Sequence, residues 1–197
     1  GVNAGGAITT GAQNVAVGQG ALATNTTGAT NTALGDSSLS ANTTASYNTA
    51  VGASALVANT TGAKNTAVGY LALTTATTAS FNTAVGAYAA DALSTGTNNT
   101  AVGLQALSTA TTSDNNTAVG FQSLLVNTTG ASNVAVGAGA LDANTTANHN
   151  VGIGAVALGV NTTGTQNVAV GSLTLDANTT GNNNTALGYD SLEDVTV

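Results

Sequence analysis

Large apolar, small and polar residues recur along the chain in a unit of 17 residues. The unit reads close to N-T-A-V-G-x-x-A-L-x-x-N-T-T-G-x-x, and its positions are numbered from the first asparagine. Positions 2 to 4 alternate between larger and small residues before a glycine, which predicts a short β-strand that ends at a turn. The leucine at position 9 predicts a second strand, so each unit is expected to contain a strand and a turn twice.

The interval between units is constant, with no insertion or deletion in 197 residues. The unit is too short for helical-pair repeats, which need about 33 residues or more, and Asn, Thr, Gly and Val are poor helix formers. We therefore predict an all-β fold, a parallel β-solenoid (β-roll or β-helix) with 17-residue coils, about eleven full coils plus a partial first coil. Residues 1–197 form a single repeat domain, with a partial coil at 1–13 and coils that start at 14, 31, 48, 65, 82, 99, 116, 133, 150, 167 and 184.

The pattern also predicts which side chains face inward. Position 4 is always Val, Leu or Ile, position 2 is always Thr or Val, and position 9 is Leu in ten of the eleven copies, with Ala90 as the exception. Because alternate residues of a strand point to opposite sides, we expect positions 2 and 4 to face the core together with this leucine. Positions 3 and 8 are always small, which suits either close packing against another solenoid or a narrow coil. So thin a coil is stable only when it stacks on its neighbours.

Stacking at about 4.8 Å per coil places identical residues above one another. The invariant asparagine at position 1 is expected to form a hydrogen-bonded ladder along the rod, as asparagines do in stacked sheets. The glycine at position 5 occurs in all eleven copies, which indicates a positive φ or a close backbone approach at a corner. The ladder asparagines are Asn14, Asn31, Asn48, Asn65, Asn82, Asn99, Asn116, Asn133, Asn150, Asn167 and Asn184.

Charge is scarce in this sequence. Only 5% of the residues are charged, Lys64 is the one basic residue, and the formal net charge is −7, whereas a typical domain has about 25% charged residues. The sequence has no basic patch for nucleic acid or for an anionic membrane. It also has no apolar stretch of the roughly 18 residues that a membrane span needs. We expect no nucleic-acid partner and no membrane insertion by this segment.

Catalysis needs a constellation of groups that the sequence does not supply. His149 is the only histidine and lies at the variable position 17, where it is interpreted as a solvated turn residue. The acids that share position 10 are Asp91, Asp142, Asp176 and Glu193. Asp142 and Asp176 are two coils or about 10 Å apart, which is too far to share a calcium ion. We expect no enzyme activity, no cofactor and no metal site.

A pair of threonines recurs at positions 13 and 14, from Thr9-Thr10 to Thr179-Thr180, with Ser94-Thr95 as the one interruption. Stacked coils turn this pair into a threonine ladder, and regular threonine arrays on flat solenoid faces resemble an ice lattice in several β-helical ice-binding proteins. Adjacent residues face opposite sides of a strand, so the pair offers one outward threonine per coil. Ice binding through this ladder is the alternative function.

Many turns carry the sequence Asn-x-Thr, which is the acceptor motif for N-glycosylation. Two interpretations are open: a column of sugars along one edge, or asparagine used for its tolerance of turns. Asn98, Asn115 and Asn183 belong to Asn-Asn-Thr motifs. The candidate glycosylation sites in Asn-Thr-Thr motifs are Asn25, Asn42, Asn59, Asn127, Asn144, Asn161 and Asn178.

The aromatic residues occupy variable positions, where a thin coil has no room for them inside. We expect them on the surface, as contacts between chains or with a ligand. These candidate contact residues are Tyr47, Tyr70, Phe81, Tyr88, Phe121 and Tyr189.

The unit resembles the head repeats of trimeric autotransporter adhesins, the YadA-like heads. The matching letters are NVAVG at 14–18, 133–137 and 167–171, and NVGIG at 150–154. Strings of the type NTAVGYxAL are also similar to repeats in phage tail fibres and other long surface proteins. The resemblance to the adhesins implies a left-handed β-roll, three chains around one axis, and projection from a bacterial surface to bind host or matrix ligands.

Together these observations predict an extracellular structural fibre, filament or adhesin subunit that acts through a rigid rod and self-association. Its expected partners are copies of itself, as a homotrimer or a helical filament, and a host, matrix or cell-surface ligand. The expected location is extracellular, on a cell surface or on a phage particle.

Overall fold

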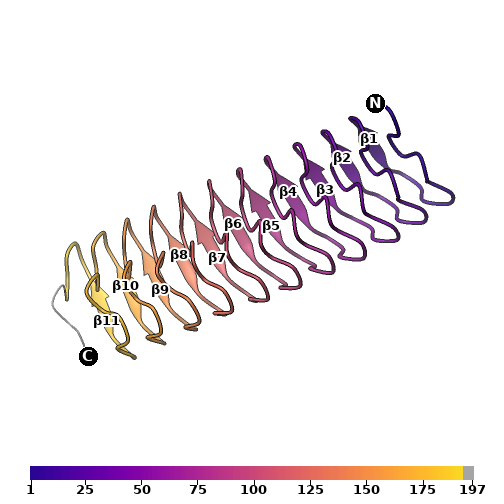
Figure 1. The fold of residues 1–197 in the computed structure, drawn as a ribbon. Helices are drawn as coiled ribbons and strands as arrows, with labels where there is room; N and C mark the ends of the chain where they lie inside the picture. Colours follow the sequence, from indigo (N-terminus) through magenta and orange to yellow (C-terminus); the bar gives the residue numbers. More distant parts are fainter. Residues whose placement is uncertain (193–197) are drawn as a thin grey trace.

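The computed structural model describes residues 1–192, and it shows a parallel β-solenoid in which each coil contributes one strand (Figure 1). The coils stack along one axis to form a rod with β1 near one end and β11 near the other. The strands are β1 (Val15–Val17), β2 (Thr32–Leu34), β3 (Thr49–Val51), β4 (Thr66–Val68), β5 (Thr83–Val85), β6 (Thr100–Val102), β7 (Thr117–Val119), β8 (Val134–Val136), β9 (Val151–Ile153), β10 (Val168–Val170) and β11 (Thr185–Leu187). The predicted fold class and the 17-residue coil are confirmed.

The strands form one eleven-stranded sheet in chain order, and each strand is parallel to the next. Every residue of β1 to β10 pairs with the residue 17 positions later, as in Thr49 with Thr66 and Val51 with Val68. Equal residues therefore lie above one another along the whole sheet. The constant period of the sequence is the direct cause of this register.

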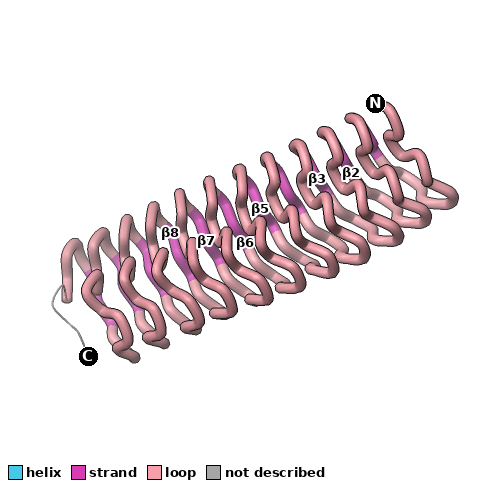
Figure 2. Tube along the Cα trace, in the orientation of Figure 1, coloured by secondary structure: helices cyan, strands magenta, loops and turns pink. Residues whose placement is uncertain are grey.

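The prediction of a second strand in each coil was wrong. Among the described residues, only positions 2 to 4 form strands, and the rest of each coil consists of turns and bends (Figure 2). Positions 7, 9 and 17 adopt the left-handed conformation; φ is 56° at Ser54, 52° at Leu56 and 60° at Lys64. Such a residue costs roughly 1–2 kcal/mol when it is not glycine, so the fold must offset this cost at three positions of each coil.

The left-handed residues turn their N–H groups toward the adjacent coils. Ser54 N–H donates to the Asp36 carbonyl at 2.8 Å, Leu56 N–H to the Ala72 carbonyl at 3.0 Å, and Lys64 N–H to the Ser46 carbonyl at 3.2 Å. The first and third acceptors belong to the previous coil and the second to the next coil. Backbone strain within a coil is thus offset by hydrogen bonds between coils, which exist only in the stack.

The prediction for the inward face of the strand was also wrong. Position 3 is buried in every strand from β2 to β11, whereas positions 2 and 4 are half-buried or exposed. The reason is lack of space inside the coil. A Cβ built on Gly152, at position 3, would lie 3.2 Å from Cγ of Leu141, the position-9 leucine of the previous coil. The inner side of the strand thus accepts alanine but not valine, and the larger side chains face outward.

The core is a column of leucines at position 9, packed against the small residues of positions 3 and 8. One coil departs from this arrangement: Ala90 stands at position 9, and Leu93 occupies position 12, where most coils have asparagine. Both side chains are buried, and the position-12 residues above and below are the small Ala76 and Ala110. The leucine has moved by three residues, and its neighbours make room for it. Small residues at positions 3 and 8 therefore fit a narrow coil and do not form an external packing face.

Candidate functional site

The position-1 asparagines form the predicted ladder along the rod. Asn48 N–H donates to Asn31 Oδ1 at 2.9 Å, and Asn65 N–H donates in turn to Asn48 Oδ1 at 2.9 Å. The side-chain Nδ2 of Asn48 donates across its own coil to the Gly62 carbonyl at 2.8 Å. Each asparagine therefore joins two coils and also closes its own coil. These contacts make the position-1 ladder a structural element, and among its buried side-chain atoms only Asn184 Nδ2 has no hydrogen-bond partner in the described residues.

A second ladder, which the sequence did not predict, is formed by the position-12 asparagines. Asn42 Nδ2 donates to Asn25 Oδ1 at 2.7 Å and to the Ala45 carbonyl at 3.0 Å. The side chains are fully buried at all seven candidate glycosylation sites, which are Asn25, Asn42, Asn59, Asn127, Asn144, Asn161 and Asn178. A glycan on these amide nitrogens is incompatible with the coil as folded, so the turn interpretation of the motif is retained. Asn98, Asn115 and Asn183, at position 17, are exposed.

The second ladder is interrupted in the middle of the rod, where position 12 is Ala76, Leu93 and Ala110 in three successive coils. Asn59 is the last asparagine before the interruption, and its buried Oδ1 has no hydrogen-bond partner. The next coil would normally supply that partner, but Ala76 has no donor there. The rod therefore has two stretches of double ladder, separated by coils in which apolar packing replaces hydrogen bonds.

A two-coil period is superimposed on the 17-residue repeat at positions 15 and 16. Position 15 alternates between glycine and a larger residue: Gly28, Ala45, Gly62, Ala79, Gly96, Ser113, Gly130, Ala147, Gly164, with Gly181 as the exception. Position 16 alternates in step, and its hydrogen-bond acceptors are Ser46, Ser80, Asp114, Asn148 and Asn182. Each acceptor receives the position-16 N–H of the previous coil, for example Ala63 to Ser80 Oγ at 3.1 Å and Thr97 to Asp114 Oδ1 at 2.6 Å.

Steric crowding explains why position 15 is glycine in alternate coils. A Cβ on Gly62 would meet the carbonyl oxygen of Ala79 in the next coil and would lie 2.5 Å from Asn59 Oδ1. A Cβ on Gly96 would meet the carbonyl oxygen of Ser113 in the same way. Two coils of different type, one with glycine at position 15 and one with alanine or serine, therefore form a larger unit of 34 residues. The regular alternation of these residues at position 15 could have revealed this unit from the sequence.

The two threonines of each coil have different environments. At position 13 the hydroxyl is engaged: Thr26 Oγ1 donates to the Thr43 carbonyl at 3.0 Å, and Thr43 Oγ1 donates to the Thr60 carbonyl at 3.2 Å. The position-14 threonines, such as Thr44 and Thr61, are exposed. The threonine pair thus presents one outward column, as expected from the sequence, and its other column connects the coils.

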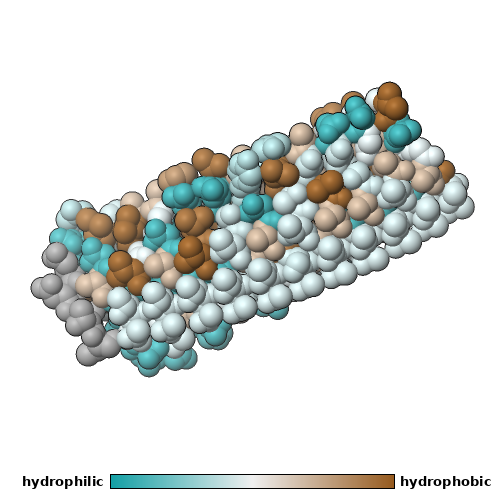
Figure 3. Space-filling model, viewed as in Figure 1, coloured by the Kyte–Doolittle hydropathy of each residue, from teal (hydrophilic) through white to brown (hydrophobic). Residues whose placement is uncertain are grey.

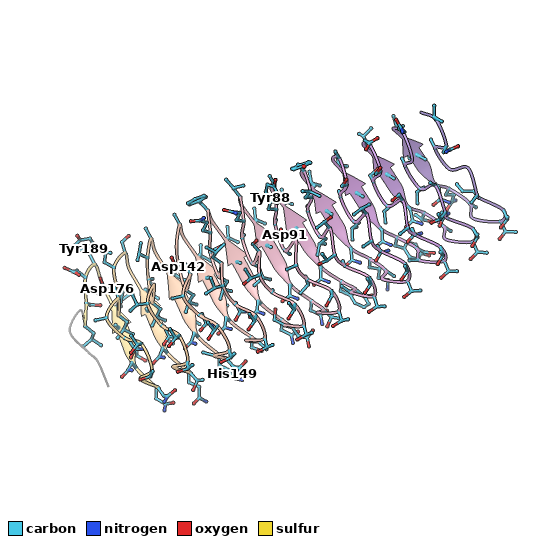
Figure 4. The ribbon with its side chains drawn as sticks, viewed as in Figure 1. Tyr88, Asp91, Asp142, His149, Asp176 and Tyr189 are labelled. Atoms are coloured by element: carbon cyan, nitrogen blue, oxygen red, sulfur yellow. The ribbon has the colours of Figure 1, made fainter. Side chains whose placement is uncertain are left out.

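The titratable residues do not converge. Figure 4 shows Asp91, Asp142 and Asp176 at separate points along the rod, with His149 on another edge. Asp91 Oδ1 accepts a hydrogen bond from Ser108 Oγ at 2.6 Å, and partial burial raises the pKa of Asp142 above its ordinary value, against two backbone N–H groups that lower it. Glu193 lies outside the described residues. Within residues 1–192 no three His, Cys, Asp or Glu side chains are grouped for a metal ion.

The aromatic side chains lie on the surface, and four of the six fall between residues 47 and 88. Tyr47, Tyr70 and Phe81 are 61%, 51% and 53% exposed. Tyr70 and Tyr88 pack edge to face with ring centroids 5.5 Å apart, and Lys64 Nζ lies 5.1 Å from the centroid of the Phe81 ring. Phe121 and Tyr189 are also exposed. The surface location is as expected, and the structure adds the contact between the Tyr70 and Tyr88 rings.

No cleft or cavity is present in the described part of the chain. None of its segments is a helix that could cross a membrane. No protein-family model, no curated protein and no solved structure matches the chain.

Proposed function

We propose that this chain is a rod-like structural segment of an extracellular fibre, filament or surface adhesin, in which repeated coils supply length and stiffness. The observation that carries the proposal is the unbroken register of eleven strands. Hydrogen bonds between coils involve the strands, the left-handed residues and both asparagine ladders, so a bend in the rod would strain several sets of bonds together. A stack of this kind gains length by adding coils and needs no change in its interactions.

The surface also fits a structural role. Figure 3 shows one face of the rod, on which a band of near-neutral side chains runs beside a band of mixed hydrophilic and hydrophobic side chains. Such a surface offers little for electrostatic recognition of a charged ligand, since the chain has one basic residue. The resemblance to YadA-like heads and phage fibres supports the same role, and the location outside the cell rests on that resemblance alone.

Small-angle X-ray scattering of the chain tests this role. Eleven strands about 4.8 Å apart predict a strand-to-strand length of about 48 Å. A variant that lacks residues 48–81, which are two whole coils, is expected to be shorter by about 10 Å with an unchanged cross-section. A compact particle, or a cross-section that changes with the deletion, would contradict a modular rod.

Ice binding is the second candidate function. The structure favours the outer side of the sheet, and not the threonine pair at positions 13 and 14, as the ice-binding surface. Positions 2 and 4 face outward, so the sheet presents a T-x-V pattern, as in Thr49 with Val51 and Thr66 with Val68. Unlike the position-13 hydroxyls, the position-2 hydroxyls have no hydrogen-bond partner within the described residues. A thermal-hysteresis assay on the monodisperse protein tests this candidate, and a value of zero removes it.

A further inference from the structure

The outward side of the sheet forms a continuous uncharged surface, which we call the strand face. It consists of the position-2 and position-4 side chains of β1 to β11. Position 2 contributes seven threonines and four valines, and position 4 contributes eight valines, two leucines and one isoleucine. Several of these side chains are well exposed, including Val17 at 51%, Leu34 at 45% and Ile153 at 38%. A long row of exposed aliphatic side chains on a flat sheet is typical of an interaction surface.

Four aromatic residues border this face in its N-terminal half. Tyr47 and Phe81 stand at position 17, just before the strands, and Tyr70 stands at position 6, just after β4. Tyr88 follows β5 and packs against Tyr70. Aromatic residues are enriched in protein interfaces, and here they flank β3, β4 and β5 on both edges of the strand face. The edges of the face at β3 to β5 thus carry side chains that are typical of interfaces.

The charge distribution favours a second copy of this chain over an unlike partner. The described acids lie at positions 6, 7, 10 and 16, outside the strand face: Asp36, Asp91, Asp114, Asp142, Asp176 and Asp190. Two copies, each with a net charge of −7, repel one another through their other surfaces. The strand face is where two copies can meet with no charge between them, and it offers no charged group to select a charged partner.

The size of the face indicates which side chains must take part in such a contact. Its length is about 48 Å, and three strand residues at about 3.3 Å each give it a width of about 10 Å. The resulting footprint of about 480 Å² is smaller than the roughly 800 Å² that each partner buries in a stable interface, so the aromatic side chains that flank the strands must add to the buried area. Two such faces can pack about 10 Å apart, as sheets in sandwiches do, with the rows at positions 2 and 4 interdigitated.

We propose that the strand face binds the same face of a second copy of this chain, with Tyr47, Tyr70, Phe81 and Tyr88 at its edges beside β3 to β5 as part of the contact. This proposal names a partner for the rod and rests on the structural role proposed above. A rod that stays single would overturn this inference alone, whereas a particle that is not a rod would overturn the structural role.

The test is the molar mass in solution, from size-exclusion chromatography with light scattering over a wide range of concentrations. We expect a multiple of the 18.6 kDa chain mass. The double variant Val68→Lys/Val102→Lys places a cation on two strands of the face and is expected to return the mass to that of one chain. The matched control Thr61→Lys/Thr95→Lys adds the same charges on the exposed position-14 column and is expected to keep the mass of the assembly.

A milder variant keeps the test valid if the lysines disturb folding. Val68→Thr/Val102→Thr keeps the β-branched shape, which position 2 already uses in the same strands, and is expected to weaken association at least tenfold with an unchanged circular dichroism spectrum. The proposal is overturned if the natural chain is monomeric at every concentration. It is equally overturned if the strand-face variants keep the mass of the natural assembly, or if the position-14 control dissociates as they do.

Discussion

Replacing Gly62 by alanine adds a single methyl group at position 15, where the two-coil alternation requires glycine. The new Cβ would meet the Ala79 carbonyl oxygen of the next coil and would lie 2.5 Å from Asn59 Oδ1. Both are buried oxygen atoms fixed in the stack, so the coils must separate locally or Gly62 must move. The Gly62 carbonyl accepts from Asn48 Nδ2 at 2.8 Å and from Asn59 Nδ2 at 2.9 Å, so any movement also disturbs both asparagine ladders.

The magnitude follows from these two effects. Overpacking of a tight interior costs about 1–3 kcal/mol, and each lost hydrogen bond costs about 1 kcal/mol. The free energy of unfolding is therefore expected to fall by about 2–5 kcal/mol. For a urea m-value of about 2 kcal/mol/M, the unfolding midpoint falls by about 1–2.5 M.

The assay is urea unfolding followed by circular dichroism, with Gly181→Ala as the matched control. Gly181 occupies position 15 in a coil of the other type, where the corresponding residues Ala45, Ala79 and Ala147 already carry a methyl group. Gly181→Ala is expected to be neutral or mildly stabilising. If Gly62→Ala lowers the midpoint no more than Gly181→Ala does, the steric explanation of the alternation is refuted.

Three further changes have expected outcomes. Val156 is left-handed with φ of 59°, whereas Val160 is similarly exposed and has no positive φ. In urea unfolding, Val156→Gly is expected to leave a free energy of unfolding about 1–2 kcal/mol higher than Val160→Gly does. Equal midpoints for the two variants would contradict this. Deletion of 48–64 brings together two coils with alanine at position 15, whereas deletion of 48–81 keeps the alternation of glycine and alanine. The first deletion is therefore expected to lower the thermal midpoint of unfolding more than the second, and the reverse order would contradict the two-coil unit. The raised pKa of Asp142 means that the folded chain binds this proton more tightly than the unfolded chain, so its contribution to stability falls as the pH rises from the ordinary value of 3.8. Asp142→Asn is therefore expected to stabilise the chain at pH 7, with the gain disappearing in acid, and a gain that is independent of pH would contradict a charge effect.

The coil and its register could be predicted from the sequence because they depend on periodicity alone. A constant interval leaves no freedom for loops of different length, so identical residues must stack. The position-1 ladder and the position-5 glycine followed from the same argument, and φ at the position-5 glycines lies between 122° and 144°. The exposure of the aromatic side chains could also be predicted, because a thin coil cannot enclose a ring.

The orientation of the strand could not be predicted from the usual pattern of polarity. Alternation normally places the large apolar residues inside, but the space opposite the strand is already filled by a leucine such as Leu141. The informative signal was size: position 3 is never larger than alanine, whereas position 4 accepts Val17, Leu34 and Ile153. A position that tolerates different sizes borders open space, and a position that is always small borders a close neighbour.

The second ladder and the turns were missed for a different reason. Asn-Thr-Thr reads as a surface turn and a glycosylation motif, yet residues such as Asn42 and Asn144 are buried because their amides bond to the neighbouring coil. The left-handed leucines of position 9 have no local signal either, because their conformation is stabilised by acceptors 16 residues away in sequence. Local propensity fails where the partners of a residue exist only in the stack.

Residue-resolved hydrogen–deuterium exchange by NMR tests whether hydrogen bonds between coils hold the turns of every coil in register. We expect slow exchange for the N–H groups of Leu56 and Ala63, which lie outside the strands but donate to Ala72 and Ser80 of the next coil. We expect fast exchange for Ser46 N–H, which has no acceptor in the described residues. Slow exchange confined to the strands, with Leu56 and Ala63 exchanging as fast as Ser46, would show that the turns are not held by these bonds.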